Sequence, residues 1–151
     1  MFANDESDAG LSVQKVLDWS LPDEALKTRL WTEITDPAST DSLMDSRLKI
    51  QGFWQRSQQL ELMTPYFEKY YAILKNVVDT RDREFAQVFM NGLSPAFMAR
   101  DQDETAFKEL LGKTTDPTHF FTLFLKKQID TIEIIKKARA LCAAKKEEEE
   151  K

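Results

Sequence analysis

Residues 52–71, GFWQRSQQLELMTPYFEKYY, decide the expected fold of this chain. Gly52 suits the C-terminal end of one helix. Thr64 and Pro65 suit the start of the next, because threonine can cap a helix and proline is favoured at its first position. Between these signals, residues 57–63 are expected to form a short helix or a turn. The stretch therefore predicts two helices joined at a corner.

Aromatic side chains surround that corner. The second helix carries an apolar stripe at three- and four-residue steps, which is typical of a buried helix face: Phe67, Tyr70, Tyr71, Leu74 and Val78. Phe53 and Trp54 fall at the corner itself and are expected to pack against both arms. We favour a helix–turn–helix core here over a cofactor site or a base-stacking site. Trp54 and Tyr71 should accordingly be mostly buried.

The helical pattern continues through the rest of the chain. Apolar residues at helical spacing predict helices over residues 12–19, 22–36, 41–51, 64–79, 80–93, 103–111 and 118–144. Short turns between them favour antiparallel neighbours, and pairs of roughly 35 to 45 residues are compatible with a helical-repeat solenoid. We therefore predict an all-α fold of paired antiparallel helices.

Length and composition are those of a globular protein. The chain has 151 residues, of which 42% are hydrophobic and 31% charged. We expect one domain over residues 1–144 and a charged, disordered tail over residues 145–151, because the tail contains no apolar residue. No apolar run approaches the ~20 residues of a membrane span, and the acidic N-terminus is unlike a signal peptide. A cytoplasmic location is expected.

The charge balance argues against nucleic acid as a partner. The net charge is −5, whereas nucleic-acid binding relies on clustered lysine and arginine. Outside the tail, the basic pairs Lys126-Lys127 and Lys136-Lys137 each have acidic neighbours. We interpret them as solvated helix faces.

The residues that most catalytic sites need are scarce. His119 and Cys142 are the single histidine and the single cysteine, so neither a zinc-binding cluster nor an H-E-x-x-H motif can form within the chain. The four glycines are too far apart for a phosphate-binding loop. We expect His119 to act at a helix start or in packing rather than as a general base. Cys142 is expected to be a small packed or idle side chain rather than a nucleophile. No catalytic, cofactor-binding or metal-ligating residue is expected in this chain.

The order of landmarks resembles the C-terminal helical domain of zinc aminopeptidases of the aminopeptidase N type. The likeness covers roughly residues 12–141. Its landmarks, in order, are Ala25-Leu26-Lys27, Trp31, Asp36, Arg47, Gly52-Phe53-Trp54-Gln55, Gln58, Leu60-Glu61-Leu62, Pro65-Tyr66-Phe67-Glu68, Tyr70-Tyr71, Arg83-Glu84 and Leu93-Ser94-Pro95.

This resemblance implies a right-handed, HEAT-like superhelix of paired helices. It also implies a non-catalytic role, in which the domain covers an upstream catalytic domain of the same chain and encloses a cavity for peptide substrates. The parent enzyme would remove N-terminal residues from peptides with zinc bound outside this chain, so no catalytic residue is carried over. One departure is at residues 124–130, FLKKQID, where relatives are often arginine-rich.

A second hypothesis has a different partner. A free-standing helical-repeat adaptor would bind a protein or peptide on its concave face. An H-E-x-x-H motif upstream in the same reading frame would favour the enzyme, whereas a stop codon shortly before Met1 would favour the adaptor.

Removal of residues 145–151 tests the expectation for the tail. The melting temperature should stay the same within error, because these residues bury no apolar surface. Differential scanning calorimetry of the full and shortened chains makes the comparison. A marked drop in the shortened chain would show that the acidic run docks on the folded part.

Overall fold

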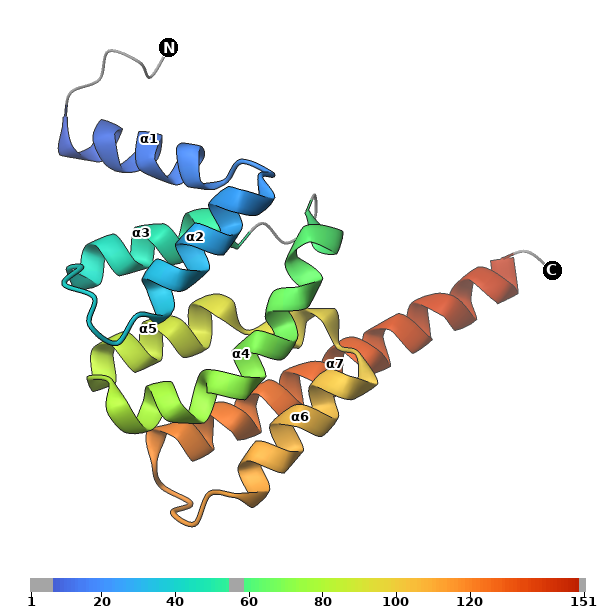
Figure 1. The fold of residues 1–151 in the computed structure, drawn as a ribbon. Helices are drawn as coiled ribbons and strands as arrows, with labels where there is room; N and C mark the ends of the chain where they lie inside the picture. The colour runs from blue at the N-terminus through green and yellow to red at the C-terminus, as the bar shows by residue number, and fades with distance from the viewer. Residues whose placement is uncertain (1–6, 55–58, 150–151) are drawn as a thin grey trace. The chain divides into compact units, whose positions relative to one another are not determined.

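The computed structural model describes residues 7–54 and 59–149. This part of the chain contains helices and no strand, which confirms the all-α prediction (Figure 1). The helices are α1 (Asp8–Trp19), α2 (Glu24–Thr35), α3 (Leu43–Phe53), α4 (Leu60–Thr80), α5 (Arg83–Leu93), the short 3-10 helix η1 (Pro95–Met98), α6 (Asp101–Gly112) and α7 (Phe120–Glu149).

The helices belong to two compact units. The first unit is Met1–Ser94 and contains α1 to α5, and the second is Pro95–Lys151 and contains η1, α6 and α7. A single domain over residues 1–144 remains a prediction. The predicted short helix or turn over residues 57–63 is helical from Leu60 onwards, and its first two residues lie outside the described part of the chain.

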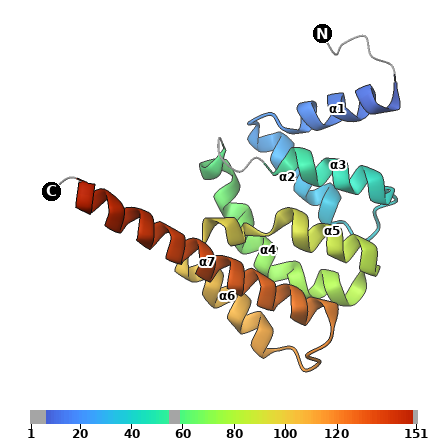
Figure 2. The same cartoon turned by 180° about the vertical axis from the view of Figure 1, so that it is seen from behind.

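The first unit consists of two layers of helices. In Figures 1 and 2, α1, α3 and α5 lie side by side and run in the same direction, with α2 and α4 on one side of them. Helix α3 contacts α1, α2 and α5, so it is the central helix of this unit.

Most helix starts in the first unit are fixed by a polar side chain. Ser7, Asp23, Ser42 and Asp82 each accept a hydrogen bond from a backbone N–H three residues later. Such capping satisfies one of the donors that the first turn leaves without a partner. The sequence therefore determines these starts locally.

Helix α4 begins earlier than expected. Gln59 precedes it, and Pro65 lies inside the helix instead of at its first position. Met63 is buried and extends the apolar stripe ahead of the proline, so packing favours the longer helix. Proline removes one backbone hydrogen bond near the helix start. Thr64 caps nothing, and its hydroxyl instead donates to the Leu60 carbonyl.

The predicted aromatic corner is present. Phe53 is fully buried and Trp54 is 8% exposed. The Phe53 ring meets the Tyr66 ring edge-on, and the Trp54 ring meets Phe67 in the same way, with centroids 5.0 and 5.2 Å apart. Tyr71 is only half-buried. The corner is thus a packed core, as the sequence indicated.

The buried face of α4 differs in part from the predicted stripe. Phe67, Tyr70 and Leu74 are buried as expected, but the next buried residue is Val77, whereas Val78 is half-buried. A step of three residues from Leu74 therefore continues the stripe, because the helical period lies between three and four residues.

Two glycines allow the helices of one layer to approach closely. A Cβ at Gly52 would lie 2.6 Å from Trp19 Cβ in α1, and a Cβ at Gly92 would lie 2.4 Å from Ile50 Cγ2 in α3. Gly52 is still inside α3, and the described glycines have no positive φ. The expected helix-ending role of Gly52 is therefore replaced by a packing role.

The second unit has a core of its own. Helices α6 and α7 pack against each other and against η1, with Phe107 and Phe124 in edge-on ring contact. Arg100 forms a two-pronged ion pair with the buried Asp103 at the start of α6. Helix α7 continues to Glu149 with exposed side chains, so the described part of the tail is helical, and its mobility in solution remains a prediction.

Substitution of alanine at two glycines tests the close approach. Gly52→Ala should destabilise the first unit by about 1–3 kcal/mol, because the new methyl group overlaps the main chain and Cβ of α1. Gly112→Ala is the matched control, since nothing lies within 4 Å of its Cβ position, and it should be neutral or slightly stabilising. Urea denaturation followed by circular dichroism measures both. Equal stability of the two variants would contradict this packing role.

Candidate functional site

A buried lysine lies where three helices of the first unit meet. Lys27 has an exposed fraction of 0%, and its ammonium donates hydrogen bonds to the Trp19 carbonyl at 2.8 Å and the Gly52 carbonyl at 3.1 Å. These carbonyls belong to the last turns of α1 and α3, where backbone acceptors lack partners within the helix. One side chain from α2 thus joins the C-terminal ends of two neighbouring helices.

The surroundings of Lys27 disfavour its charge. Burial lowers the pKa of its ammonium from 10.5 to about 8. The two carbonyls and the negative ends of the two helix dipoles partly offset this cost. The Phe53 ring centroid lies 5.8 Å from Nζ, a distance at which a cation–π attraction adds to the balance. The position serves structure, because no solvent reaches the amine.

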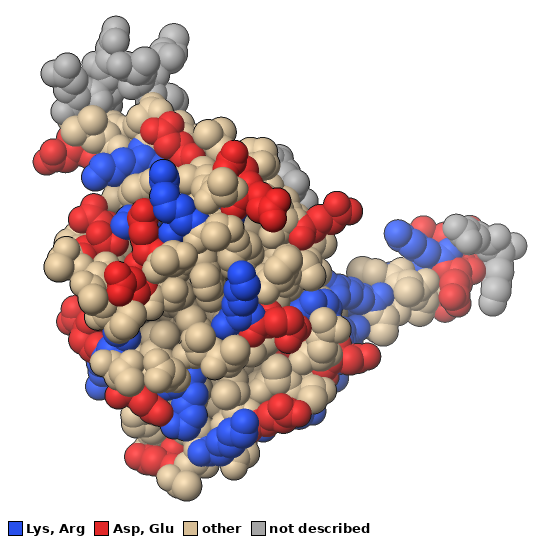
Figure 3. Space-filling model, in the orientation of Figure 1, with Lys and Arg blue, Asp and Glu red and all other residues tan. Residues whose placement is uncertain are grey.

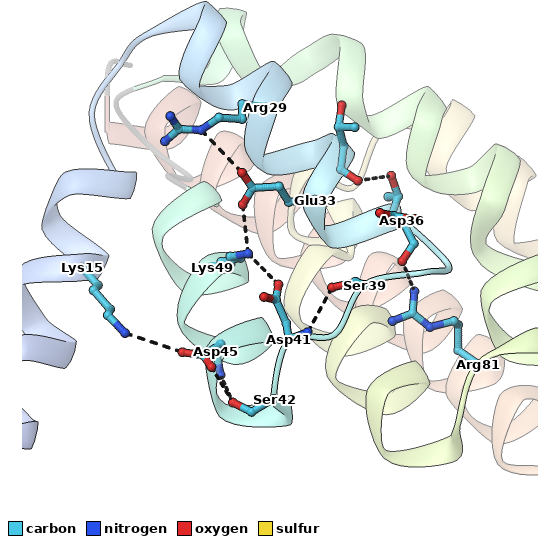
Figure 4. Close-up of polar contacts among 12 residues, drawn as sticks. Lys15, Arg29, Glu33, Asp36, Ser39, Asp41, Ser42, Asp45, Lys49 and Arg81 are labelled. Atoms are coloured by element: carbon cyan, nitrogen blue, oxygen red, sulfur yellow. Dashed lines mark hydrogen bonds and ion pairs between the residues drawn. The ribbon is translucent and has the colours of Figure 1, made fainter.

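An ion-pair network connects α2 and α3 on the surface (Figure 4). Lys49 Nζ lies 2.9 Å from Glu33 and 2.5 Å from Asp41, while Lys15 Nζ is 3.6 Å from Asp45. The two carboxylates raise the pKa of Lys49 against the opposing effect of its burial. The Ser42 hydroxyl, which also caps α3, lowers the pKa of Asp45.

Helices α3 and α5 line a groove on the surface of the first unit. One hollow of about 370 Å³ is lined by Arg47, Ile50, Gln51, Trp54, Val88 and Gly92. A second, of about 510 Å³, shares Arg47 and Val88 with the first and is completed by Glu84, Gln87 and Asn91. We call these residues together the α3–α5 groove. Its floor is mainly apolar, and its rim carries charged and amide side chains.

The sequence singled out His119 and Cys142, and the structure separates them. His119 is exposed beside the start of α7, and its Nδ1 accepts a hydrogen bond from the Phe121 N–H at 3.3 Å. This confirms its helix-start role. Cys142 is exposed on α7, so it is not packed in a core, and the expectation that it is idle stays a prediction. Neither residue lies in the α3–α5 groove.

The charges of the second unit form local pairs. Lys136 of α7 contacts both Asp101 and Glu104 of α6. Hydrogen bonds from Lys108 and Lys136 lower the pKa of Glu104 to about 2. These contacts hold α7 against the start of α6. On the face drawn in Figure 3, acidic and basic residues are interspersed.

Residues 7–54 and 59–149 contain no group of three or more His, Cys, Asp and Glu side chains that could hold a metal ion. None of the helices in this same part of the chain is both long enough and apolar enough to cross a membrane.

Comparison with known proteins gives one informative match. Over 75 residues, the chain is 35% identical to the aminopeptidase N of Streptomyces lividans. The matched segment is 50% of this chain but 8% of that protein. No protein-family profile matches the chain. The match supports a relation to the aminopeptidase N family.

Sequence analysis missed the burial of Lys27. The signal was its helical spacing, because Lys27 precedes the buried Leu30 and Ile34 by three and seven residues on one face of α2. The α3–α5 groove left no such signal, since its two sides come from helices that are distant in sequence.

Replacement of Lys27 tests its role. Lys27→Met keeps the aliphatic volume but leaves two buried carbonyls without a donor, so the free energy of unfolding should fall by about 2–4 kcal/mol at pH 7. Lys127→Met, an exposed position of α7, is the control and should change it by less than about 0.5 kcal/mol. Urea denaturation measures both variants.

The difference in the free energy of unfolding between the wild type and Lys27→Met should depend on pH. The folded pKa of about 8 lies below the unfolded value of 10.5, so the folded chain binds fewer protons between these pH values. The stability of the wild type relative to Lys27→Met should therefore rise from pH 8 to pH 10.5, by roughly 1–3 kcal/mol. A constant difference over this range would mean that the buried amine does not titrate there.

Proposed function

We propose that this chain is a non-catalytic helical domain of a zinc-dependent aminopeptidase, in the position of the C-terminal domain of the aminopeptidase N family. The 35% identity over 75 residues carries the proposal. The matched segment is a small fraction of a much longer relative, which agrees with a chain that forms one part of a larger enzyme.

The arrangement of helices supports a HEAT-like superhelix. The landmarks of α5 follow those of α3 by 40 residues: the caps Ser42 and Asp82, the glycines Gly52 and Gly92, and the last helical residues Phe53 and Leu93. HEAT repeats are about 40–47 residues long. The two glycines also have equivalent roles, since each lets its helix approach the preceding helix of the same layer.

In the proposed enzyme, this domain covers the upstream catalytic domain and helps to enclose the peptide cavity. Zinc and its ligands belong to the catalytic domain. Enclosure excludes water and positions the substrate, and both effects lower the barrier to hydrolysis. A cytoplasmic location belongs to the same proposal.

Measurements on the isolated chain and on the parent enzyme test this function. The purified 151-residue chain should bind no stoichiometric zinc and should release no amino acid from aminoacyl reporter substrates. Deletion of the chain from the full-length parent should lower kcat/KM for peptides by about tenfold or more, because each ~1.4 kcal/mol of lost transition-state stabilisation is a factor of ten. The zinc content of the truncated parent should be unchanged.

Two outcomes would contradict the proposed function. Zinc-dependent hydrolysis by the isolated chain would overturn the non-catalytic role. A parent reading frame without a zinc-aminopeptidase motif would overturn the family proposal and favour the free-standing adaptor that binds a protein or peptide.

A further inference from the structure

Close packing fixes the spacing of the two helices that line the α3–α5 groove. Its two helices run side by side in the same direction (Figure 1). Gly92 fits directly against Ile50, so the spacing of the helices is fixed by backbone against side chain. Ser42 and Asp82 cap their first turns. A ligand would therefore meet a preformed surface, which reduces the entropic cost of binding.

The groove combines a buried apolar floor with an exposed polar rim. Ile50 is 3% exposed and Trp54 is 8% exposed, and both line the hollow with the half-buried Val88. Arg47 and Glu84 are exposed at the rim of the adjoining hollow. Small-molecule sites commonly have this combination of apolar lining and a few polar groups.

The charges at the rim differ from the other charges of α3. Asp45 and Lys49, on the same helix, are both held in ion pairs. In contrast, the side chains of Arg47 and Glu84 make no ion pair or hydrogen bond with any residue of the described chain, and they do not pair with each other. The amide of Gln87, which lines the same hollow, also makes no side-chain hydrogen bond there.

We propose that the α3–α5 groove binds a small zwitterion with an apolar side chain, namely a free amino acid or a short peptide. Arg47 pairs with its carboxylate, because a guanidinium presents parallel N–H donors that match two carboxylate oxygens. Glu84 pairs with its ammonium group. The apolar side chain lies on Ile50 and Val88, and Gln87 is placed to bond to a peptide amide.

The two opposite charges explain why a zwitterion fits better than a simple ion. An anion alone would leave Glu84 facing a like charge, and a cation alone would do the same at Arg47. A zwitterion satisfies both groups at once. Because the site is exposed, each charge pair is weak, and binding should weaken further as salt rises.

A panel of four ligands tests the site on the 151-residue chain. Leucine, leucyl-leucine, N-acetyl-leucyl-leucine and leucyl-leucine amide are titrated at low salt while two-dimensional amide NMR spectra are recorded. Leucyl-leucine or leucine should shift the amide signals of residues on both sides of the groove. The ligand with the higher affinity shows whether the groove binds a short peptide or a free amino acid. The N-acetyl peptide and the peptide amide, in which one end is uncharged, should each bind at least fivefold more weakly than leucyl-leucine.

Two variants assign the two charges. Arg47→Gln should remove the preference for leucyl-leucine over its amide, whereas Glu84→Gln should remove the preference over the N-acetyl peptide. Arg29→Gln and Glu68→Gln are the matched controls, because both are exposed charges of the same unit outside the groove, and they should leave all affinities unchanged. Circular dichroism checks that each variant is folded.

The outcomes separate this proposal from the function proposed above. No shift at millimolar ligand, or equal binding of free and blocked peptides, would overturn the zwitterion site. Shifts outside the groove that survive both Gln variants would overturn it as well. None of these results bears on zinc binding or peptide hydrolysis by the parent, which are measured independently.

Discussion

The ammonium of Lys27 is the interaction on which the first unit depends. Two helix ends meet at this point, and each presents carbonyls that lack a partner within its own helix. Lys27 reaches them from the interior, because its side chain is fully buried. A long aliphatic side chain that ends in a donor reaches both carbonyls while packing like an apolar residue along its stem. The cost is a buried charge, which is why the pKa of this group falls towards the physiological range.

The close approach of the helices follows from the same junction. The Gly52 carbonyl accepts a hydrogen bond from Lys27. Because Gly52 has no side chain, Trp19 of α1 can pack closely against it. A larger residue would push α3 away and lengthen the hydrogen bond to the ammonium. Gly92 repeats the arrangement one helix further along the layer, against Ile50. The layer of α1, α3 and α5 is thus built by repeating one type of contact.

Around this layer, aromatic rings fill the space between helices. Trp31 of α2 lies within 5.8 Å of the Phe53 ring and 5.4 Å of the Tyr66 ring. The Tyr70 hydroxyl donates to the Met90 carbonyl at 2.8 Å and so ties α4 to α5, while burial raises its pKa. These contacts pack the helices that carry the α3–α5 groove.

The helical class, helix starts near residues 41 and 80, and the aromatic corner were predictable from local sequence, because caps and apolar periodicity act over a few residues. The sequence also predicts that His119 and Cys142 do not make a catalytic centre, and this stays a prediction. The position of Pro65 within a helix depends on tertiary packing, since the buried Met63 extends the apolar stripe ahead of the proline. The hydrogen-bond partners of Lys27, the packing of Gly92 and the presence of Arg47 and Glu84 in one groove could not be predicted either. Each depends on helices that are far apart in the chain, and local periodicity carries no information about which distant faces meet.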